Sequence, residues 1–370
     1  MATWFEKLFG FTEDGYDRVQ GAFDYDPSAG TLRSRANGVS FNCGTFSTPT
    51  LGQLRADALE TLRRMPSLVA GRVTVTHIAI GDILEEHALH PQALFQAASQ
   101  LNCLEMPGRS VTPEEGVTNY VWDRTQGPAC AVACAAGTVV RNYFVDVGAL
   151  ACPRRGLPAS GGPLGQREDR QINLLDEVEA AIGNAEHRFW TVKNGYLSVA
   201  GDRVKDLPGA LGGPRRDSLL SLVKIGLQAG VGVTFARGAH VFEPPALPVT
   251  VSQAYCSAMP VEGADAAALA PVARLLLDGL YEATLWAAVL NAHRTGCHDV
   301  FLTFVGGGVW GNDPVWIAAA MARAVAKVSA AVGAALAVHI CHFRRVDARL
   351  AALVDREIAA AVADAKFRSV

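Results

Sequence analysis

Residues 300–325 read Val-Phe-Leu-Thr-Phe-Val-Gly-Gly-Gly-Val-Trp-Gly-Asn-Asp-Pro-Val-Trp-Ile-Ala-Ala-Ala-Met-Ala-Arg-Ala-Val. The β-branched and aromatic run 300–305 predicts a buried strand. Asp313 followed by Pro314 predicts the start of a helix, because a short acceptor side chain and a residue without an N–H suit the first helical positions. The glycines between them allow the backbone to turn sharply or to contact a ligand.

This order of strand, glycine loop and helix N-terminus favours an anion, because the free N–H groups and the helix dipole point toward the loop. We therefore predict that the loop holds the phosphates of a nucleotide-like ligand. The alternative is tight packing alone, since one such loop is weak evidence by itself.

The composition excludes some partners. Half of the 370 residues are hydrophobic, which is enough for a sizeable core. The 33 basic and 36 acidic residues give a net charge of −3, so no bulk attraction to nucleic acid or to an anionic membrane is expected. The sequence has neither a leader-like N-terminus nor an apolar stretch of about 18 residues. We therefore expect a cytoplasmic protein, with no nucleic acid and no membrane as partner.

The eight cysteines are scattered through apolar segments and are typical of buried thiols in a reducing compartment. Cys130 and Cys134, four residues apart on a predicted helix, have a spacing that could hold a metal, but small apolar packing explains them better. We predict no metal and no cofactor.

The chain is predicted to have two parts, an extension at 1–68 that packs on the body and a body at 69–370 with insertions. Strands are predicted at 73–80, 93–101, 141–147, 231–235, 248–260, 300–305 and 336–343, and a strand that turns at Asn194-Gly195 at 189–199. Helices are predicted at 128–140, 172–182, 219–227, 266–295 and 316–332, with loops at 151–170 and 201–216. Such alternation indicates a three-layer α/β/α fold with a mixed central sheet.

The segment Gly81-Asp82-Ile83 follows the strand predicted at 73–80. A carboxylate just beyond a strand end can accept a hydrogen bond from the exocyclic amine of adenine. The alternative is that Asp82 only caps the following turn.

Three segments in this order resemble the macrodomain, the ADP-ribose-binding α/β/α module: Gly81-Asp82-Ile83, the strand ending in Ala97-Ala98-Ser99, and the glycine loop with its helix. The resemblance covers residues 70–345, with large insertions. It implies that adenine lies against Asp82 and Ile83. The other ligand-binding residues that it implies are Ser99, Gln100 and Asn102 near the distal ribose, Gln126, and Gly306, Gly307, Gly308, Val309, Trp310, Gly311 and Asn312 at the diphosphate. Gln96 and Ser99 stand where many macrodomains carry asparagine, with Asn102 as the alternative ribose contact.

The connection 105–128 carries four carboxylates. Cleavage of a glycosidic bond passes through an oxocarbenium-like centre, for which carboxylates stabilise charge, activate water and protonate the leaving group. The pair Glu114-Glu115 is similar to the paired glutamates of poly(ADP-ribose) glycohydrolases, which implies a catalytic role. Alternatively, Thr112 and Glu115 form a capping box at an ordinary helix start, and both interpretations are compatible.

Asp123 ranks first among the catalytic candidates, because the turn Gln126-Gly127-Pro128 after it suits the close approach of a ligand. This loop and the glycine loop are similar to those of bacterial effector macrodomains that remove ADP-ribose from arginine. The similarity implies that acidic residues grip a guanidinium group.

The sequence thus predicts an ADP-ribosyl hydrolase that cleaves the N- or O-glycosidic bond at the distal ribose of ADP-ribosylated protein, with ADP-ribosyl-arginine as one expected substrate. Its expected partner is ADP-ribose or an ADP-ribosylated protein. Two alternatives are a reader that binds ADP-ribose without cleaving it and a hydrolase of a free ADP-ribose derivative. The acid-rich loop favours the enzyme.

Overall fold

A computed structural model describes residues 2–64, 72–151, 162–184, 186–199, 201–211, 215–237, 242–261, 266–331 and 335–367. Parts of the predicted loops at 151–170 and 201–216 lie outside these ranges.

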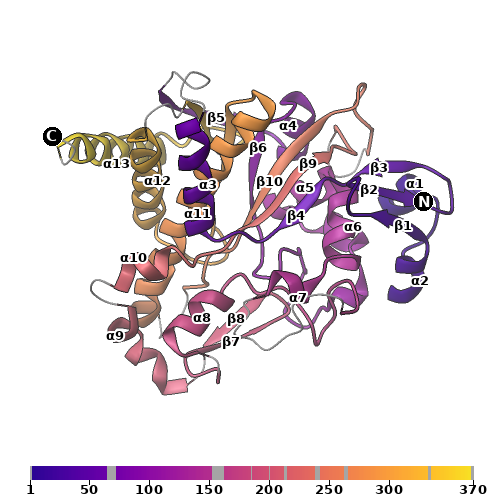
Figure 1. The fold of residues 1–370 in the computed structure, drawn as a ribbon, viewed down its shortest axis with the longest axis horizontal. Helices are drawn as coiled ribbons and strands as arrows, with labels where there is room; N and C mark the ends of the chain where they lie inside the picture. Colours follow the sequence, from indigo (N-terminus) through magenta and orange to yellow (C-terminus); the bar gives the residue numbers. More distant parts are fainter. Residues whose placement is uncertain are drawn as a thin grey trace.

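A seven-stranded sheet forms the centre of the molecule, with strand order β4-β9-β10-β6-β11-β12-β5 (Figure 1). Five neighbouring strands are parallel, and the other two, at one edge, are antiparallel. The parallel strands are β5 (Val73–Ile80), β6 (Leu94–Ala98), β10 (Thr250–Cys256), β11 (Asp299–Leu302) and β12 (Leu336–Phe343). The antiparallel strands are β4 (Thr45–Ser47) and β9 (Gly226–Gly232). The predicted mixed sheet is confirmed.

Helices cover both faces of this sheet (Figure 1). One layer contains α3 (Leu51–Arg64), α11 (Ala266–Thr295) and α12 (Pro314–Ser329), with α13 (Ala348–Phe367) packed on α12. The opposite layer contains α4 (Ile83–Leu89), α5 (Gln126–Ala133) and α6 (Ala135–Tyr143). The three-layer α/β/α class predicted from the sequence is therefore confirmed.

The N-terminal residues form a small aromatic subassembly beside α6 (Figure 1). Its elements are α1 (Trp4–Phe9), α2 (Tyr16–Gly21) and a sheet of β1 (Phe23–Asp26), β2 (Thr31–Ser34) and β3 (Ser40–Asn42). Phe5, Phe9 and Phe23 pack edge to face with centroids 4.7 to 6.4 Å apart. The extension also reaches the central sheet, because β4 pairs with β9.

The remaining elements connect the sheet strands. They are η1 (Pro113–Glu115), η2 (Thr118–Trp122), α7 (Val147–Leu150), α8 (Asp176–Ile182), β7 (Trp190–Lys193), β8 (Tyr196–Val199), η4 (Gly201–Asp206), α9 (Leu207–Leu211) and α10 (Arg215–Leu220). The predicted turn at Asn194-Gly195 joins β7 to β8, and both residues have positive φ, 50° and 76°, as a tight hairpin requires.

Two element predictions are wrong. The strand expected at 141–147 is absent, because α6 continues to Tyr143 and α7 begins at Val147. Arg141 is buried there because Cys103 O, Gln228 Oε1 and Thr138 Oγ1 accept its hydrogen bonds, which no local pattern indicates. The helix expected at 219–227 is also wrong, since α10 ends at Leu220 and β9 takes the segment from Gly226 because it pairs with β4 and β10.

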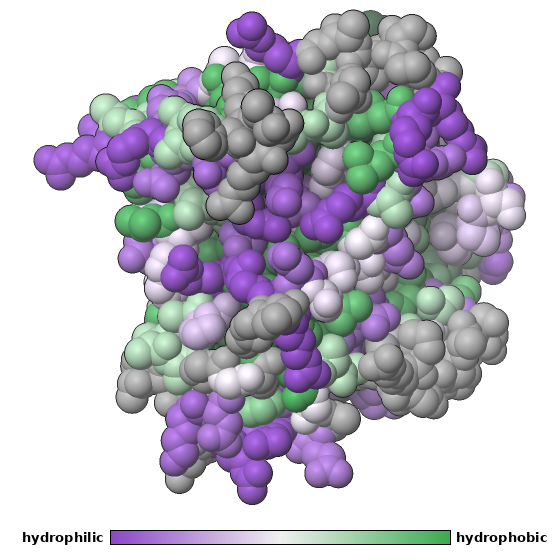
Figure 2. Space-filling model, turned by 60° about the vertical axis from the view of Figure 1, so that its left-hand side comes forward, coloured by the Kyte–Doolittle hydropathy of each residue, from purple (hydrophilic) through white to green (hydrophobic). Residues whose placement is uncertain are grey.

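One face of the molecule shows how hydrophilic and hydrophobic residues are distributed on its surface (Figure 2). On the face in Figure 2, hydrophilic residues extend across the middle and hydrophobic ones lie between them in small groups. Within the described ranges, no helix is long and apolar enough to cross a membrane.

Candidate functional site

The carboxyl ends of the five parallel strands meet at one edge of the sheet, where ligands of open α/β sheets bind. Asp82 follows β5, Ser99 follows β6, and the glycine loop 306–311 follows β11. β6 and β11 are direct neighbours, whereas β5 and β11 are two strands apart, or about 10 Å. The predicted ligand-binding segments therefore lie along the same edge.

The glycine loop is closed by Asn312. The side-chain Nδ2 of Asn312 donates to Met259 O at 2.9 Å, and its backbone N–H donates to Gly306 O at 3.0 Å. Gly306 has a φ of +75°, and a Cβ atom there would lie 2.5 Å from the Cβ of Ala258. Only glycine therefore fits this position without a shift of its surroundings.

The tip of the loop offers free hydrogen-bond donors. Within the part of the chain that the structure describes, the N–H groups of Gly308, Val309 and Trp310 have no hydrogen-bond partner. Val309, at the tip, is 76% exposed. Asp313 caps the 16-residue α12 through Val315 N at 2.8 Å. The loop therefore presents amides beside a helix N-terminus, an arrangement that suits a phosphate.

Asp82 is the N-cap of α4. Its Oδ1 accepts from Leu84 N at 2.9 Å, and Ile83 is buried behind it. The capping role considered from the sequence is thus present. Oδ2 forms no hydrogen bond to any described residue, so the contact with adenine stays a prediction.

Ser99, Gln100 and Asn102 are buried. Gln100 binds the backbone of Met106 twice, accepting from its N–H at 3.1 Å and donating to its carbonyl at 2.6 Å. Asn102 donates to Gln171 Oε1 at 2.9 Å. These side chains shape the loop after β6, and their predicted contact with ribose would require an exchange of these bonds.

Gln126 joins α5 to the end of β6. Its Oε1 accepts from Ala98 N at 2.8 Å, and its Nε2 donates to Gln96 O at 2.7 Å, so the side chain replaces a neighbouring strand. A Cβ on Gly127 would lie 2.0 Å from Ala98 O, so α5 can begin this close to β6 only with glycine there. The turn Gln126-Gly127-Pro128 was predicted to allow the close approach of a ligand. In the structure, its glycine allows the close approach of β6.

The most perturbed carboxyl group at this edge is Glu105, which is not among the candidates predicted from the sequence. It is 4% exposed, and its Oε1 has no hydrogen-bond partner in the described part of the chain. The pKa of Glu105 is raised to about 8, mainly by burial and in part by the nearby charge of Asp123, while Ser99 and Arg141 act in the opposite direction. One sequence feature could have indicated that Glu105 is buried: it stands inside the apolar run Cys103-Leu104-Glu105-Met106.

Gly127 makes room for this carboxyl group. Oε2 of Glu105 would lie 2.6 Å from a Cβ on Gly127, so any side chain there would displace it. Glu105 is therefore held between the end of β6 and the first turn of α5. A carboxyl group with a pKa near 8 is protonated at neutral pH and can donate a proton.

The three predicted catalytic carboxylates have different hydrogen-bond partners in the structure. Asp123 accepts from Thr125 N at 2.9 Å and lies near Glu105. Glu114 instead accepts from Glu168 N at 3.1 Å, and Glu115 closes the capping box with Thr112. The capping alternative is present for Glu115, and no hydrogen bond among the described residues links this pair to Glu105.

An exposed aromatic ring also lies at the edge and was missed. Phe343 ends β12, between β5 and β11, and is 69% exposed. It pairs with Ile80, two residues before Asp82, and the guanidinium of Arg344 lies 4.8 Å from its ring centroid. A flat ring between a purine acceptor and a phosphate loop can stack on a base.

The hairpin β7–β8 reaches the glycine loop from the other side. The rings of Tyr196 and Trp310 stack with centroids 6.3 Å apart, and Tyr196 Oη donates to Met106 O at 2.8 Å. Trp310 is thereby connected to the loop that carries Glu105.

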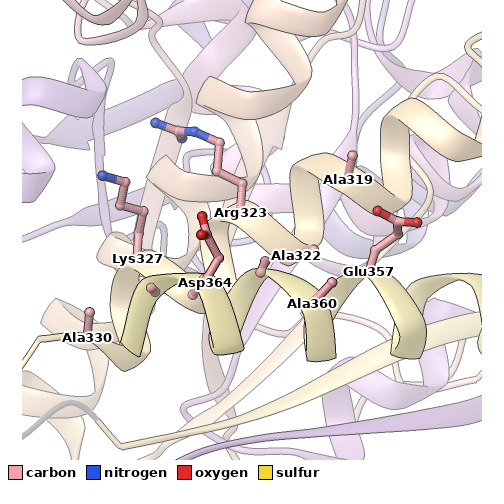
Figure 3. Close-up of a pocket in the computed structure, with 11 residues that line it drawn as sticks. Ala319, Ala322, Arg323, Lys327, Ala330, Glu357, Ala360 and Asp364 are labelled. Carbon is pink, nitrogen blue, oxygen red and sulfur yellow. The ribbon is translucent and has the colours of Figure 1, made fainter. Parts of the chain in front are cut away.

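Two cavities in the described part of the chain lie away from this candidate site, and none of their lining residues belongs to it. The larger, about 660 Å³, lies between α12 and α13 and is lined mainly by alanines with Arg323, Lys327, Glu357 and Asp364 (Figure 3). The other, about 490 Å³, lies beside α11. Across the described ranges, no cluster of three or more His, Cys, Asp or Glu residues suits a metal ion. Cys130 and Cys134 are buried free thiols whose pKa is raised by burial.

No family model matches the chain, and neither does the sequence of any curated protein. Its structure is similar to poly(ADP-ribose) glycohydrolase from Deinococcus radiodurans in complex with ADP-ribose. The TM-score is 0.44 and the identity 13%, over 85% of this chain and 94% of that chain.

The structure is also similar to poly(ADP-ribose) glycohydrolase from Thermomonospora curvata bound to the inhibitor ADP-HPD. Here the TM-score is 0.36 and the identity 12%, over 93% of this chain and 95% of that chain. Both of these proteins are poly(ADP-ribose) glycohydrolases. At these scores and identities they assign no role to any residue of this chain, so its function has to be inferred from its own side chains.

Proposed function

We propose that this protein is an ADP-ribosyl hydrolase that cleaves the glycosidic bond at the distal ribose of ADP-ribosylated protein. One observation carries the proposal: a buried, proton-bearing carboxyl group, Glu105, lies at the same sheet edge as the free amides of 308–310. Glu105, in the loop after β6, supplies an acid. The amides of 308–310, in the loop after the neighbouring strand β11, supply an anion site.

The chemistry assigns a role to each group. As the bond between C1 of ribose and its acceptor breaks, the leaving atom needs a proton and the sugar develops positive charge. Glu105, with a pKa of about 8, donates the proton at neutral pH. Asp123 stabilises the oxocarbenium-like charge and orients the attacking water. In this proposal Glu114 and Glu115 hold the loop through their backbone contacts.

The ligand is proposed to lie along the sheet edge. The amides after Gly307 bind the diphosphate, Asp82 binds the adenine amine through its free Oδ2, and Phe343 stacks on the base. The distal ribose then lies beside Ser99 and Glu105 at the end of β6. The order of the strands supports this arrangement, because β12 with Phe343 stands between β5 and β11.

Arginine is the acceptor that we propose first. A guanidinium leaving group is positively charged when protonated, and the carboxylate of Asp123 is only partly buried and can bind it. An ester-linked acceptor, by contrast, leaves as a carboxylate, a weak base that needs less help from a proton donor.

Calorimetry with ADP-ribose, AMP and NAD tests the ligand class, and we expect ADP-ribose to bind most tightly. Incubation with arginine-linked and glutamate-linked ADP-ribosylated protein then tests the reaction, with release of ADP-ribose as the readout. Binding without release would identify a reader instead. Release only from small ADP-ribose derivatives would identify the other alternative, and no binding of ADP-ribose would exclude all three.

A further inference from the structure

Glu13, in the N-terminal extension, reaches into the loop before Asp123. It lies between α1 and α2, yet its carboxylate accepts hydrogen bonds from Val117 N at 2.9 Å and from Thr118 N at 2.6 Å. It also accepts from Tyr143 Oη at 2.8 Å, which connects it to α6. One carboxylate of the extension thus binds two segments that are more than 100 residues away in the sequence.

The loop is shaped to receive this side chain. Gly116 has a φ of +81°, and a Cβ atom there would lie 2.4 Å from the carboxyl carbon of Glu13. Trp4 adds a second contact from the extension, since its Nε1 donates to Thr118 O at 2.8 Å. Thr118 is therefore held through both its N–H and its carbonyl by residues of α1 and the α1–α2 connection.

The held segment leads directly to the candidate site. Thr118 begins η2, which carries Tyr120 and ends one residue before Asp123. Tyr120 is 1% exposed, and the charges of both Glu105 and Glu13 act on its hydroxyl group and raise its pKa. No hydrogen bond joins the hydroxyl of Tyr120 to Oε1 of Glu105, although the backbone of Glu105 lies close enough to that hydroxyl to lower its pKa.

We propose that Glu13 is a positioning residue that holds η2, and with it Tyr120 and Asp123, in place against Glu105. The inference rests on the proposed function. In this arrangement the N-terminal extension completes the site: without its carboxylate, two backbone N–H groups and a tyrosine hydroxyl lose their acceptor, and η2 can move relative to β6. A displacement of about 1 Å at a catalytic group can lower a rate about 100-fold.

Three variants test this proposal in the full chain. Glu13→Ala removes the acceptor, and Glu13→Gln keeps one carbonyl oxygen for the amides of 117 and 118. Trp4→Phe keeps the packing but removes the donor to Thr118 O. Asp14→Ala is the matched control, because Asp14 is the next residue and forms an exposed ion pair with Arg18, away from η2.

The readouts are kcat and KM for release of ADP-ribose, the affinity for free ADP-ribose, and the melting temperature. We expect Glu13→Ala to lower kcat about 10- to 100-fold with KM and ADP-ribose affinity changed less than about threefold. Glu13→Gln should restore most of kcat, Trp4→Phe should lie between the two, and Asp14→Ala should match the wild type.

Other outcomes distinguish a failure of the positioning role of Glu13 from a failure of the proposed hydrolase function. An active wild type with an unchanged kcat in folded Glu13→Ala would overturn the positioning role alone. Loss of ADP-ribose affinity in proportion to kcat would also overturn it, because that indicates general unfolding of the site. A wild-type protein that binds ADP-ribose but cleaves no substrate would overturn the proposed function, and faster hydrogen exchange at 117–118 in Glu13→Ala would then still report that Glu13 holds η2.

Discussion

At the residue scale, Glu105 is a carboxyl group whose buried surroundings oppose its ionisation. A carboxyl group is ionised in water at neutral pH, but burial at the first turn of α5 keeps this one protonated, although Ser99 and Arg141 act in the opposite direction. Arg141 is buried nearby but directs its N–H groups at Cys103 O, Gln228 Oε1 and Thr138 Oγ1, so it forms no hydrogen bond with Glu105. Such perturbed groups are more frequent at functional sites than elsewhere.

The rate of the proposed reaction should report this pKa. If protonated Glu105 is the acid, kcat/KM falls as pH rises through about 8. Glu105→Gln should lose at least about 100-fold in kcat and lose this basic limb, because the amide donates no proton. A pH–rate profile from pH 5 to 10 measures both. An active Glu105→Gln variant with an unchanged pH–rate profile would show that another group is the proton donor.

The stability of the fold should depend on the same proton. The pKa of Glu105 is about 8 in the folded protein, against 4.5 for an unperturbed glutamic acid, so the folded state binds the extra proton between these values. The contribution of Glu105 to the free energy of unfolding therefore falls by at most a few kcal/mol as pH rises from 4.5 to 8, and it changes little above pH 8.

Glu105→Gln lacks this penalty, so it should melt at a higher temperature than the wild type at pH 8.5, and the difference should vanish near pH 4.5. Thermal denaturation at both pH values decides the point. Equal melting temperatures at pH 8.5 would mean that the carboxyl group is hydrated in solution. Higher stability with lower activity would be the usual compromise at a catalytic group.

At the element scale, the glycine loop combines one strained position with one open position. Gly306 is enclosed by Ala258 and Asn312, whereas a Cβ on Gly308 would meet nothing within 4 Å. The two glycines look alike in the sequence, and only their surroundings distinguish them.

Gly306→Ala should lower the free energy of unfolding by about 1–3 kcal/mol, because a positive φ and two close contacts both oppose the new side chain. Gly308→Ala should cost less than about 1 kcal/mol and serves as the matched control. Urea denaturation measures both. Equal costs would mean that the loop is not closed by Asn312 as described.

At the scale of the whole molecule, Glu282 joins α3, α11 and α12. This carboxylate of α11 is buried and accepts from Arg55 of α3 at 2.5 Å, from Trp286 Nε1 at 3.2 Å and from Arg323 of α12. Three helices of one layer thus converge on one charge. The contact therefore fastens α3 to α11 and α12 in the same layer.

Glu282→Gln should destabilise the fold by about 2–4 kcal/mol, since it removes the charge that two arginines face. Glu60→Gln is the control, because Glu60 pairs with Arg63 and Arg64 on the exposed side of α3 and should change stability by less than about 1 kcal/mol. Chemical denaturation compares them. A cost no larger than that of the control would show that the arginines are equally well solvated without their partner.

The sequence alone was sufficient for the features that depend on neighbouring residues. The strand, glycine loop and capped start of α12 follow from β-branched residues, glycine and the Asp313-Pro314 pair, and the turn at Asn194-Gly195 follows from backbone preferences. These properties are local, because φ preferences and caps involve residues a few positions apart.

Tertiary structure alone decided which polar groups lie in water and which are buried. Nothing near residue 105 in the sequence shows that Gly127 leaves room for its carboxyl group, that Gln126 binds β6, or that Glu13 holds Thr118. The helical state of Arg141 likewise depends on acceptors at 103 and 228. A pKa and a buried hydrogen bond depend on the dielectric surroundings and on distant partners, and these exist only once the chain has folded.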